Sequence, residues 1–121
     1  MVKTVNILGA SYRVYLDVPE YKDRDLAGRF GYCSFTTKRI VVADLDTIEL
    51  WKDESSYSKK VQRNATLRHE IIHAFLNESG LCGSSASSEA WALNEEMVDW
   101  LAIQFPKILK VFRKLGCEGD I

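Results

Sequence analysis

Two histidines four residues apart, with a glutamate directly after the first, are the side chains of this sequence most suited to chemistry. They are His69 and His73, the two histidines of the chain, with Glu70 following His69. On a helix, residues i and i+4 lie on one face, so both imidazoles can reach a single metal ion. Zinc suits this pair, because two neutral imidazoles leave room for a third protein ligand and a water.

Glu70 is expected to act on that water rather than to bind the metal. It lies about 100° round the helix from His69, beside the position of the water, where its carboxylate can take a proton. The neighbouring residues fit a helix that is buried behind a metal site, because four of them are apolar: Ile71, Ile72, Ala74 and Phe75.

The third ligand must be an acid or a cysteine, since no other histidine exists. Glu95 falls on the same helical stripe as Val98 and Ala102, and we therefore predict a buried Glu95 as the third ligand. Asp99, four residues further on, is expected to accept a hydrogen bond from the outer nitrogen of a ligating histidine.

Glu96 is the alternative to Glu95 as the third ligand, although helical counting turns it toward solvent. The two glutamates could also be an acidic pair that favours the helix dipole at an N-terminus. The cysteines, Cys33, Cys82 and Cys117, are odd in number and widely spaced, which argues against disulfides and a cysteine zinc site. Cys82 could approach the metal, but a structural role is favoured.

Length and composition indicate one soluble domain covering residues 1–121. The 46% hydrophobic and 27% charged residues are ordinary, and a net charge of −1 gives no reason to expect nucleic acid. The N-terminus lacks the apolar core of a signal peptide, and no stretch approaches the ~20 apolar residues of a membrane span. We expect a cytoplasmic protein without membrane contact.

The first third of the sequence predicts a small, mostly antiparallel sheet. Residues Val5 to Val18 read as a hairpin with a turn at Gly9-Ala10-Ser11. Phe30 to Phe35 and Ile40 to Asp44 are rich in aromatic and β-branched residues and predict a second hairpin. The sheet would then have three or four strands.

The remainder of the sequence predicts helices. A cap among Ser55 to Ser58 begins a long helix that carries both histidines and ends near Ser79, before Gly80. Strands followed by helices predict an α+β domain, with the sheet packed against the histidine helix and a glutamate-bearing helix.

The glutamate-bearing helix is expected to begin at Ser87 or Ser88 and to reach about Phe105. Pro106 should break it, because proline lacks the main-chain N–H that a helix needs. A final helix would then run from Lys107 to Leu115 and close at Gly116.

The two helical motifs together resemble the minimal gluzincins of the ImmA/IrrE type, small metallopeptidase domains of bacteria, phages and mobile elements. In that family the third ligand is the glutamate of an E-x-x-A-[ND]-x-F-A pattern, which corresponds here to Glu95, Val98, Asp99, Leu101 and Ala102. Val98 replaces alanine, Leu101 replaces phenylalanine, and no helix-turn-helix domain accompanies the motifs. The resemblance spans roughly Gly28 to Pro106 and implies a phage- or prophage-encoded zinc peptidase.

These observations lead us to expect hydrolysis of a peptide bond in an intracellular protein substrate. Zinc would polarise the peptide carbonyl, and Glu70 would act as general base. Substrate could add as a strand along an open sheet edge near Ile40 to Ala43. Tyr32 and Tyr57 are the candidates for stabilising the oxyanion, although no signal distinguishes them.

Two other interpretations remain open. The chain could be an inactive zinc-binding protein that acts by binding a host or phage protein, because so small a domain has little room for a deep cleft. Its tryptophans, Trp51, Trp91 and Trp100, could then anchor the partner. A purely structural zinc is the third interpretation, but it leaves Glu70 without a role.

Overall fold

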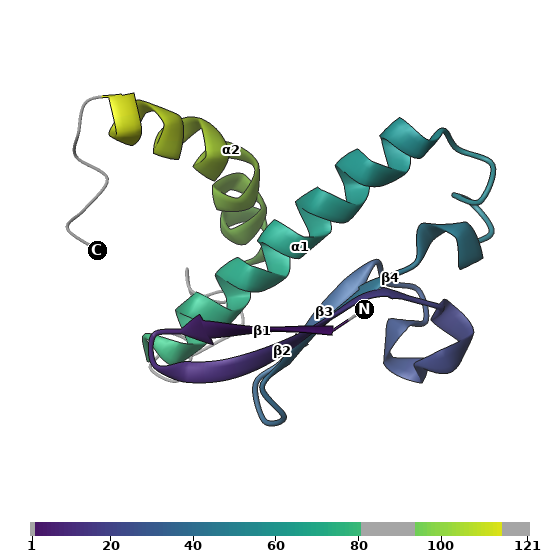
Figure 1. The fold of residues 1–121 in the computed structure, drawn as a ribbon, viewed down its shortest axis with the longest axis horizontal. Helices are drawn as coiled ribbons and strands as arrows, with labels where there is room; N and C mark the ends of the chain where they lie inside the picture. Colours follow the sequence, from purple (N-terminus) through teal and green to yellow (C-terminus); the bar gives the residue numbers. More distant parts are fainter. Residues whose placement is uncertain (1, 81–93, 115–121) are drawn as a thin grey trace.

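The computed structural model describes residues 2–80 and 94–114, which form an α+β fold of one sheet and two long helices (Figure 1). The strands are β1 (Val2–Ile7), β2 (Ala10–Val18), β3 (Gly31–Ser34) and β4 (Arg39–Ala43); the helices are α1 (Ser56–Glu78) and α2 (Glu95–Lys114). Helix α1 crosses one face of the sheet, and α2 packs against α1. In these two ranges, no helix combines the length and apolar character that crossing a membrane requires.

The sheet is mixed, with strand order β1-β2-β4-β3. The β1–β2 and β3–β4 pairs are antiparallel, as predicted, whereas β2 and β4 run parallel. Strand β4 therefore lies inside the sheet, and its Ile40, Val41 and Val42 are buried. The β1–β2 turn lies at Leu8 and Gly9 rather than at the predicted Gly9-Ala10-Ser11, because these two residues take the positive φ of 51° and 94° that a tight hairpin needs.

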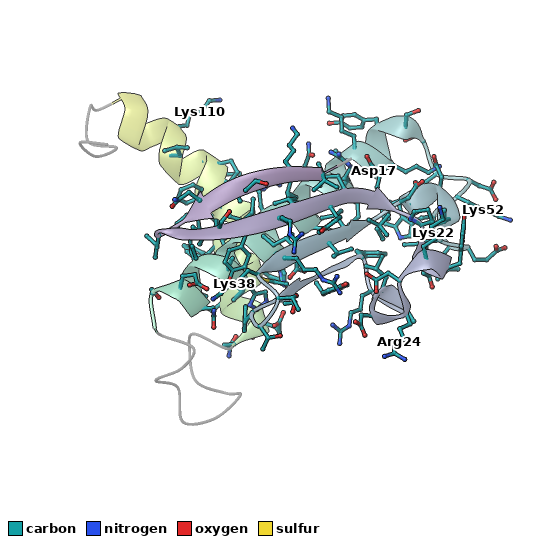
Figure 2. All side chains as sticks on the ribbon, turned by 60° about the horizontal axis from the view of Figure 1, so that its bottom comes forward. Asp17, Lys22, Arg24, Lys38, Lys52 and Lys110 are labelled. Atoms are coloured by element: carbon teal, nitrogen blue, oxygen red, sulfur yellow. The ribbon has the colours of Figure 1, made fainter. Side chains whose placement is uncertain are left out.

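The core lies on both faces of the sheet. On the α1 face it consists of alternating strand residues and one helix residue: Ile7, Tyr12, Val14, Leu16, Ile40, Val42 and Ala74. On the other face a smaller cluster forms beneath two short 3-10 helices, Glu20–Lys22 and Arg24–Leu26, and contains Leu26, Tyr32, Val41 and Ala43. Figure 2 shows Lys22 and Arg24 on this covering segment.

Helix α1 begins and ends close to the predicted residues. The Ser55 side chain accepts a hydrogen bond from the N–H of Ser58, and Gly80 follows the helix with φ +88°. Near its end, Glu78 accepts hydrogen bonds from the Tyr12 hydroxyl at 2.7 Å and from Lys38 Nζ at 2.5 Å. These bonds attach the C-terminal turn of α1 to the sheet, and Lys38 is labelled in Figure 2.

Helix α2 differs from the prediction at both ends. It begins at Glu95, where Asn94 Oδ1 accepts a hydrogen bond from the N–H of Met97 at 3.0 Å; the predicted start at Ser87 or Ser88 lies outside the described residues. The predicted break at Pro106 is wrong, because the helix continues through this residue to Lys114. The predicted end at Gly116 also lies outside the described residues.

The helix tolerates Pro106 because α1 supplies the missing donor. Without an N–H at Pro106, the carbonyl of Ala102 loses its partner within α2. Arg68 of α1 donates from Nε to this oxygen at 3.1 Å. Beyond Pro106, α2 extends away from α1 (Figure 1).

Candidate metal site

The two histidines lie one turn apart on the face of α1 that meets α2. His69 Nε2 and His73 Nε2 are 3.2 Å apart, as the i, i+4 spacing allows. Burial lowers the pKa of His73, although the nearby Glu95 carboxylate acts in the opposite direction. Burial therefore favours the neutral imidazole, which is the form that binds a metal.

Glu95, in the first turn of α2, reaches both imidazoles. Its two carboxylate oxygens lie 3.1 Å from His69 Nε2 and 3.0 Å from His73 Nε2. A tetrahedral metal with ligand bonds of about 2.0–2.1 Å places its ligand atoms about 3.3 Å apart. The three groups therefore have the spacing of metal ligands.

Asp99 fixes which nitrogen of His69 faces Glu95. Its Oδ1 lies 2.5 Å from His69 Nδ1. Because an ionised carboxylate only accepts, Nδ1 carries the donated proton and the Nε2 of a neutral ring presents a lone pair. A lone pair that faces a carboxylate oxygen at 3.1 Å requires a proton or a cation between them.

Glu70 is the buried acid of the site, with 6% of its surface exposed. Burial raises its pKa to about 7; His69 lowers it, and the Glu95 carboxylate raises it further. The ligand atoms of His69, Glu70 and His73 lie within 4.8 Å of one another, so this group could hold a metal ion. Glu95 adds a second carboxylate that contacts both imidazoles.

Gly31 of β3 allows α1 to approach the sheet closely enough to bury Glu70. A Cβ atom there would lie 2.8 Å from Thr66 Cγ2, 2.7 Å from the Val41 carbonyl oxygen and 3.6 Å from Glu70 Cγ. The first two distances are too short for any side chain, so only glycine permits this packing.

The site opens into two hollows that share Gly31, His69 and Glu70. The more polar one, of about 470 Å³, also borders Arg29, Cys33, Phe35, His73 and Glu95. The other, of about 400 Å³, is lined by apolar side chains from both helices and from the loop before β3: Phe30, Ala65, Ala102 and Ile103. A groove therefore passes the histidines along β3.

The structure brings together all four residues predicted at the metal, together with Asp99. Glu96 is exposed and makes no hydrogen bond or ion pair with the histidines. The side chain of Glu95 contacts both of them, but it is 67% exposed rather than buried. The prediction of a buried Glu95 is wrong, because the residue lies in the first turn of α2, at the rim of the polar hollow.

The expected substrate strand lies inside the sheet, and of the two tyrosines suggested for the oxyanion only Tyr32 borders the polar hollow. Ile40 to Ala43 is not at an edge, because β4 pairs on both sides; the edge strand beside the histidines is β3. The Tyr32 hydroxyl donates to Asp23 at 2.5 Å, and burial raises its pKa to about 12. Tyr57 is 74% exposed, about three turns of α1 before His69.

Arg29 is a residue of the site that sequence reasoning missed. It lines the polar hollow and acts electrostatically on Glu70. Its position in a charged loop gave no signal of this contact. Among the other candidates, Cys33 borders the same hollow and Trp51 packs edge-to-face on Phe30, with 5.7 Å between ring centroids. Cys82, Trp91 and Cys117 lie outside the described residues.

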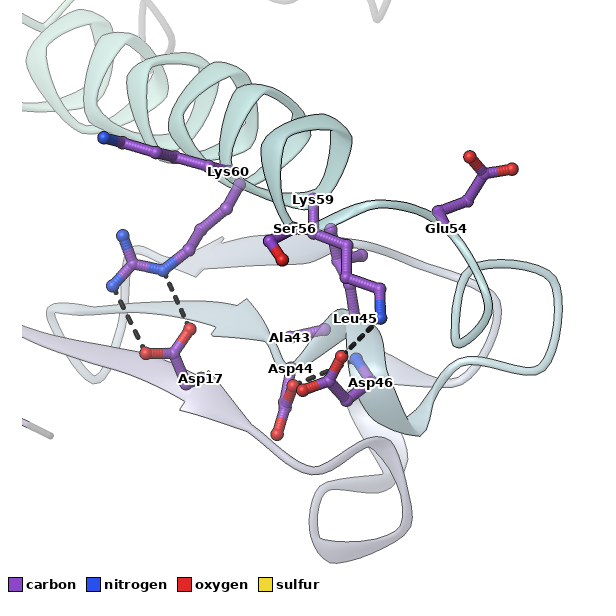
Figure 3. Close-up of a pocket in the computed structure, with 10 residues that line it drawn as sticks. Asp17, Ala43, Asp44, Leu45, Asp46, Glu54, Ser56, Lys59 and Lys60 are labelled. Atoms are coloured by element: carbon purple, nitrogen blue, oxygen red, sulfur yellow. Dashed lines mark hydrogen bonds and ion pairs between the residues drawn. The ribbon is translucent and has the colours of Figure 1, made fainter.

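A separate hollow of about 330 Å³ lies at the N-terminal end of α1 (Figure 3). Four of its charged side chains form two ion pairs. Arg63 Nε lies 2.8 Å from Asp17 Oδ1, and Lys59 Nζ lies 2.5 Å from Asp46 Oδ1. This hollow shares no residue with the histidine site.

The chain matches no protein-family model, no curated protein and no solved structure. The resemblance to ImmA/IrrE-type gluzincins therefore stays a similarity of motifs. What the site does has to be inferred from its own residues.

Proposed function

We propose that this chain is a zinc-dependent peptidase that holds its metal through His69, His73 and Glu95. The observation that carries the proposal is the convergence of three ligand groups at separations of 3.0–3.2 Å around one point. Three protein ligands leave one position of a tetrahedral zinc site open, which is the arrangement of catalytic rather than structural zinc.

Glu70 is the proposed general base. Bound zinc supplies a Lewis acid that polarises a peptide carbonyl and makes water more acidic. Glu70 takes the proton of the attacking water and returns it to the leaving amine. In the protein without a metal, burial raises the pKa of this carboxyl to about 7, which makes it a stronger base than an exposed glutamate. Asp99 keeps the proton of His69 on Nδ1, so that Nε2 stays available to the metal.

Strand β3 is the proposed support for the substrate main chain. Phe30 O accepts a hydrogen bond from the N–H of Ala43 at 2.8 Å, so Phe30 faces β4. Because the direction alternates along an antiparallel strand, Gly31 turns its N–H and C=O groups to the open edge. An extended peptide can pair with these groups and pass the histidines in the groove.

The alternative function is a metal-binding protein that recognises another protein without cleaving it. The specific observation in its favour is a pair of neighbouring exposed apolar residues on α2, Trp100 and Ile103, with Phe105 exposed on another side of the same helix. Such residues are typical of contact surfaces between proteins. The two functions differ in what they require of Glu70.

Replacing Glu70 with glutamine decides between them. Glu70→Gln keeps size and hydrogen bonding but removes the base, so zinc content should stay at wild-type level while cleavage falls about 10²- to 10⁴-fold. Cleavage can be measured by mass spectrometry on a peptide library and on proteins from cells that express either form. Glu96→Gln is the matched control. Identical fragments from wild type and Glu70→Gln would contradict the peptidase proposal and favour the binding protein.

A further inference from the structure

Pro106 releases a main-chain carbonyl at the place where α2 contacts α1. In a helix the N–H of residue i donates to the carbonyl of residue i−4, and proline has no such N–H. The Ala102 carbonyl therefore has no helical partner and accepts instead from Arg68 Nε at 3.1 Å. Arg68 directly precedes His69, so this bond lies next to the proposed metal site.

Three residues of α2 make polar contacts with α1, one after another along the helix. Glu95 contacts His73 and His69, Asp99 contacts His69, and Ala102 contacts Arg68. Glu95, Asp99 and Ala102 are spaced by four and three residues, which places them on one face of α2. Glu95 and Asp99 contact histidines that are proposed to bind the metal, whereas Ala102 contacts Arg68, which is not a proposed ligand.

The position of Glu95 depends on how α2 lies along α1. The side chain is 67% exposed and belongs to the first turn, so its immediate surroundings hold it weakly. Val98 and Ala102 are buried against the body of the protein, but apolar packing has no direction of its own. A hydrogen bond with defined geometry restricts both sliding and rotation of the helix.

We propose that Arg68 is a positioning residue that fixes α2 along α1 through the Ala102 carbonyl, which Pro106 leaves without a donor in its own helix. Glu95 and Asp99 are thereby held where they meet the histidines. The inference rests on the proposed zinc site, but it does not depend on peptidase activity.

Four proteins test the inference: wild type, Arg68→Met, Pro106→Ala and the double variant. Methionine keeps an apolar stem of similar length but has no N–H donor. Arg68→Met should lower zinc affinity about tenfold, as expected when the support of a ligand is lost, and should lower the urea midpoint of the metal-free protein. Pro106→Ala alone should keep wild-type zinc affinity, because a carbonyl can accept from both donors.

The double variant distinguishes two roles of the Arg68 bond: fixing α2 along α1, and merely supplying a donor to the Ala102 carbonyl. The N–H of the new alanine can donate to the Ala102 carbonyl, so the urea midpoint should recover. Zinc affinity should stay about tenfold low, because the bond between the helices is still missing. Recovery of both quantities would overturn the proposal, and so would an Arg68→Met protein whose zinc affinity lies within twofold of wild type.

Two further variants complete the experiment. Arg63→Met is the matched control, because Arg63 lies on the same helix but pairs with Asp17; its zinc affinity should equal that of wild type. If Arg68→Met does not fold, Arg68→Lys takes its place, with a smaller loss of affinity expected and an unchanged affinity contradicting the proposal. A wild-type chain that binds no zinc contradicts the metal site and this inference together, whereas zinc binding indifferent to Arg68 contradicts this inference alone.

Discussion

The two ends of α1 each border a hollow lined by charged or ionisable side chains, but they satisfy these groups differently. At the N-terminal end Lys59 and Arg63 form ion pairs with Asp46 and Asp17, so these four side chains meet groups of opposite charge (Figure 3). Toward the C-terminal end two imidazoles face the Glu95 carboxylate, and Asp99 holds the Nδ1 proton of His69. A proton or a metal ion can link the imidazole nitrogens to this carboxylate.

The difference suggests where to look for a metal site: the chemical groups that face one another in a hollow are more informative than its volume. In an exposed ion pair the two opposite charges neutralise each other, and the pair contributes at most about 1 kcal/mol to stability. At the histidine site, imidazole nitrogens and carboxylate oxygens come within 3.0–3.2 Å of one another, a spacing that a proton on a ring nitrogen or a metal ion between the groups accounts for. Changing residues at either end should therefore have very different effects on zinc binding.

The largest effect is expected from the third ligand. Glu95→Ala removes a carboxylate that contacts both imidazoles and should lower zinc affinity by more than 100-fold, beyond the 10- to 100-fold typical of an outer partner. Glu96→Ala, next to it in the same turn, should change the affinity less than twofold. Competition with a chromophoric chelator measures both. A larger loss in Glu96→Ala would mean that the neighbouring glutamate is the ligand.

The second effect concerns stability and pH in the metal-free protein. Burial raises the pKa of Glu70 from 4.5 to about 7, so between these pH values the folded state binds more protons than the unfolded state. Stability should therefore fall as pH rises through this window, by up to about 3 kcal/mol from this group. In Glu70→Gln the decrease in unfolding free energy that Glu70 causes between these pH values should disappear. Urea unfolding with EDTA at pH 5 and pH 8 checks it, and equal pH dependence in both proteins would exclude Glu70 as the cause.

The third effect concerns Asp99. Asp99→Ala removes the acceptor of the His69 Nδ1 proton, so zinc affinity should fall about 10- to 100-fold while the fold is retained, because the side chain is mostly exposed. The chelator competition described above measures this loss. An unchanged affinity would show that the contact does not orient His69.

The smallest effect is expected at the other end of α1. Arg63→Ala breaks the pair with Asp17 and should cost less than about 1 kcal/mol of unfolding free energy, because the pair is partly exposed. Zinc stoichiometry should not change. A loss of zinc in Arg63→Ala would contradict the view that the N-terminal end of α1 takes no part in zinc binding.

Local signals made part of this molecule predictable. Helix α1 has a serine cap at Ser55 and a glycine with positive φ at Gly80, and these signals act within one turn of the chain. The spacing of His69 and His73 fixes their relation by helix geometry alone. The alternation of core residues in β2 also appears directly in the sequence.

Contacts between distant residues account for what the sequence could not predict. Strand β4 was expected at an edge, but β2 pairs with it in parallel, and no local pattern encodes that order. The continuation of α2 through Pro106 depends on Arg68, 38 positions earlier in the chain. The role of Gly31 depends likewise on its approach to Thr66 of α1.

Anomalous X-ray scattering from crystals grown with zinc tests the central claim most directly. Data collected on both sides of the zinc absorption edge locate the metal without reference to activity. The account predicts one peak per chain, about 2.0–2.1 Å from His69 Nε2, His73 Nε2 and a Glu95 carboxylate oxygen. A crystal with zinc bound elsewhere, for example in the hollow of Asp17 and Asp46, and none between the histidines would contradict it.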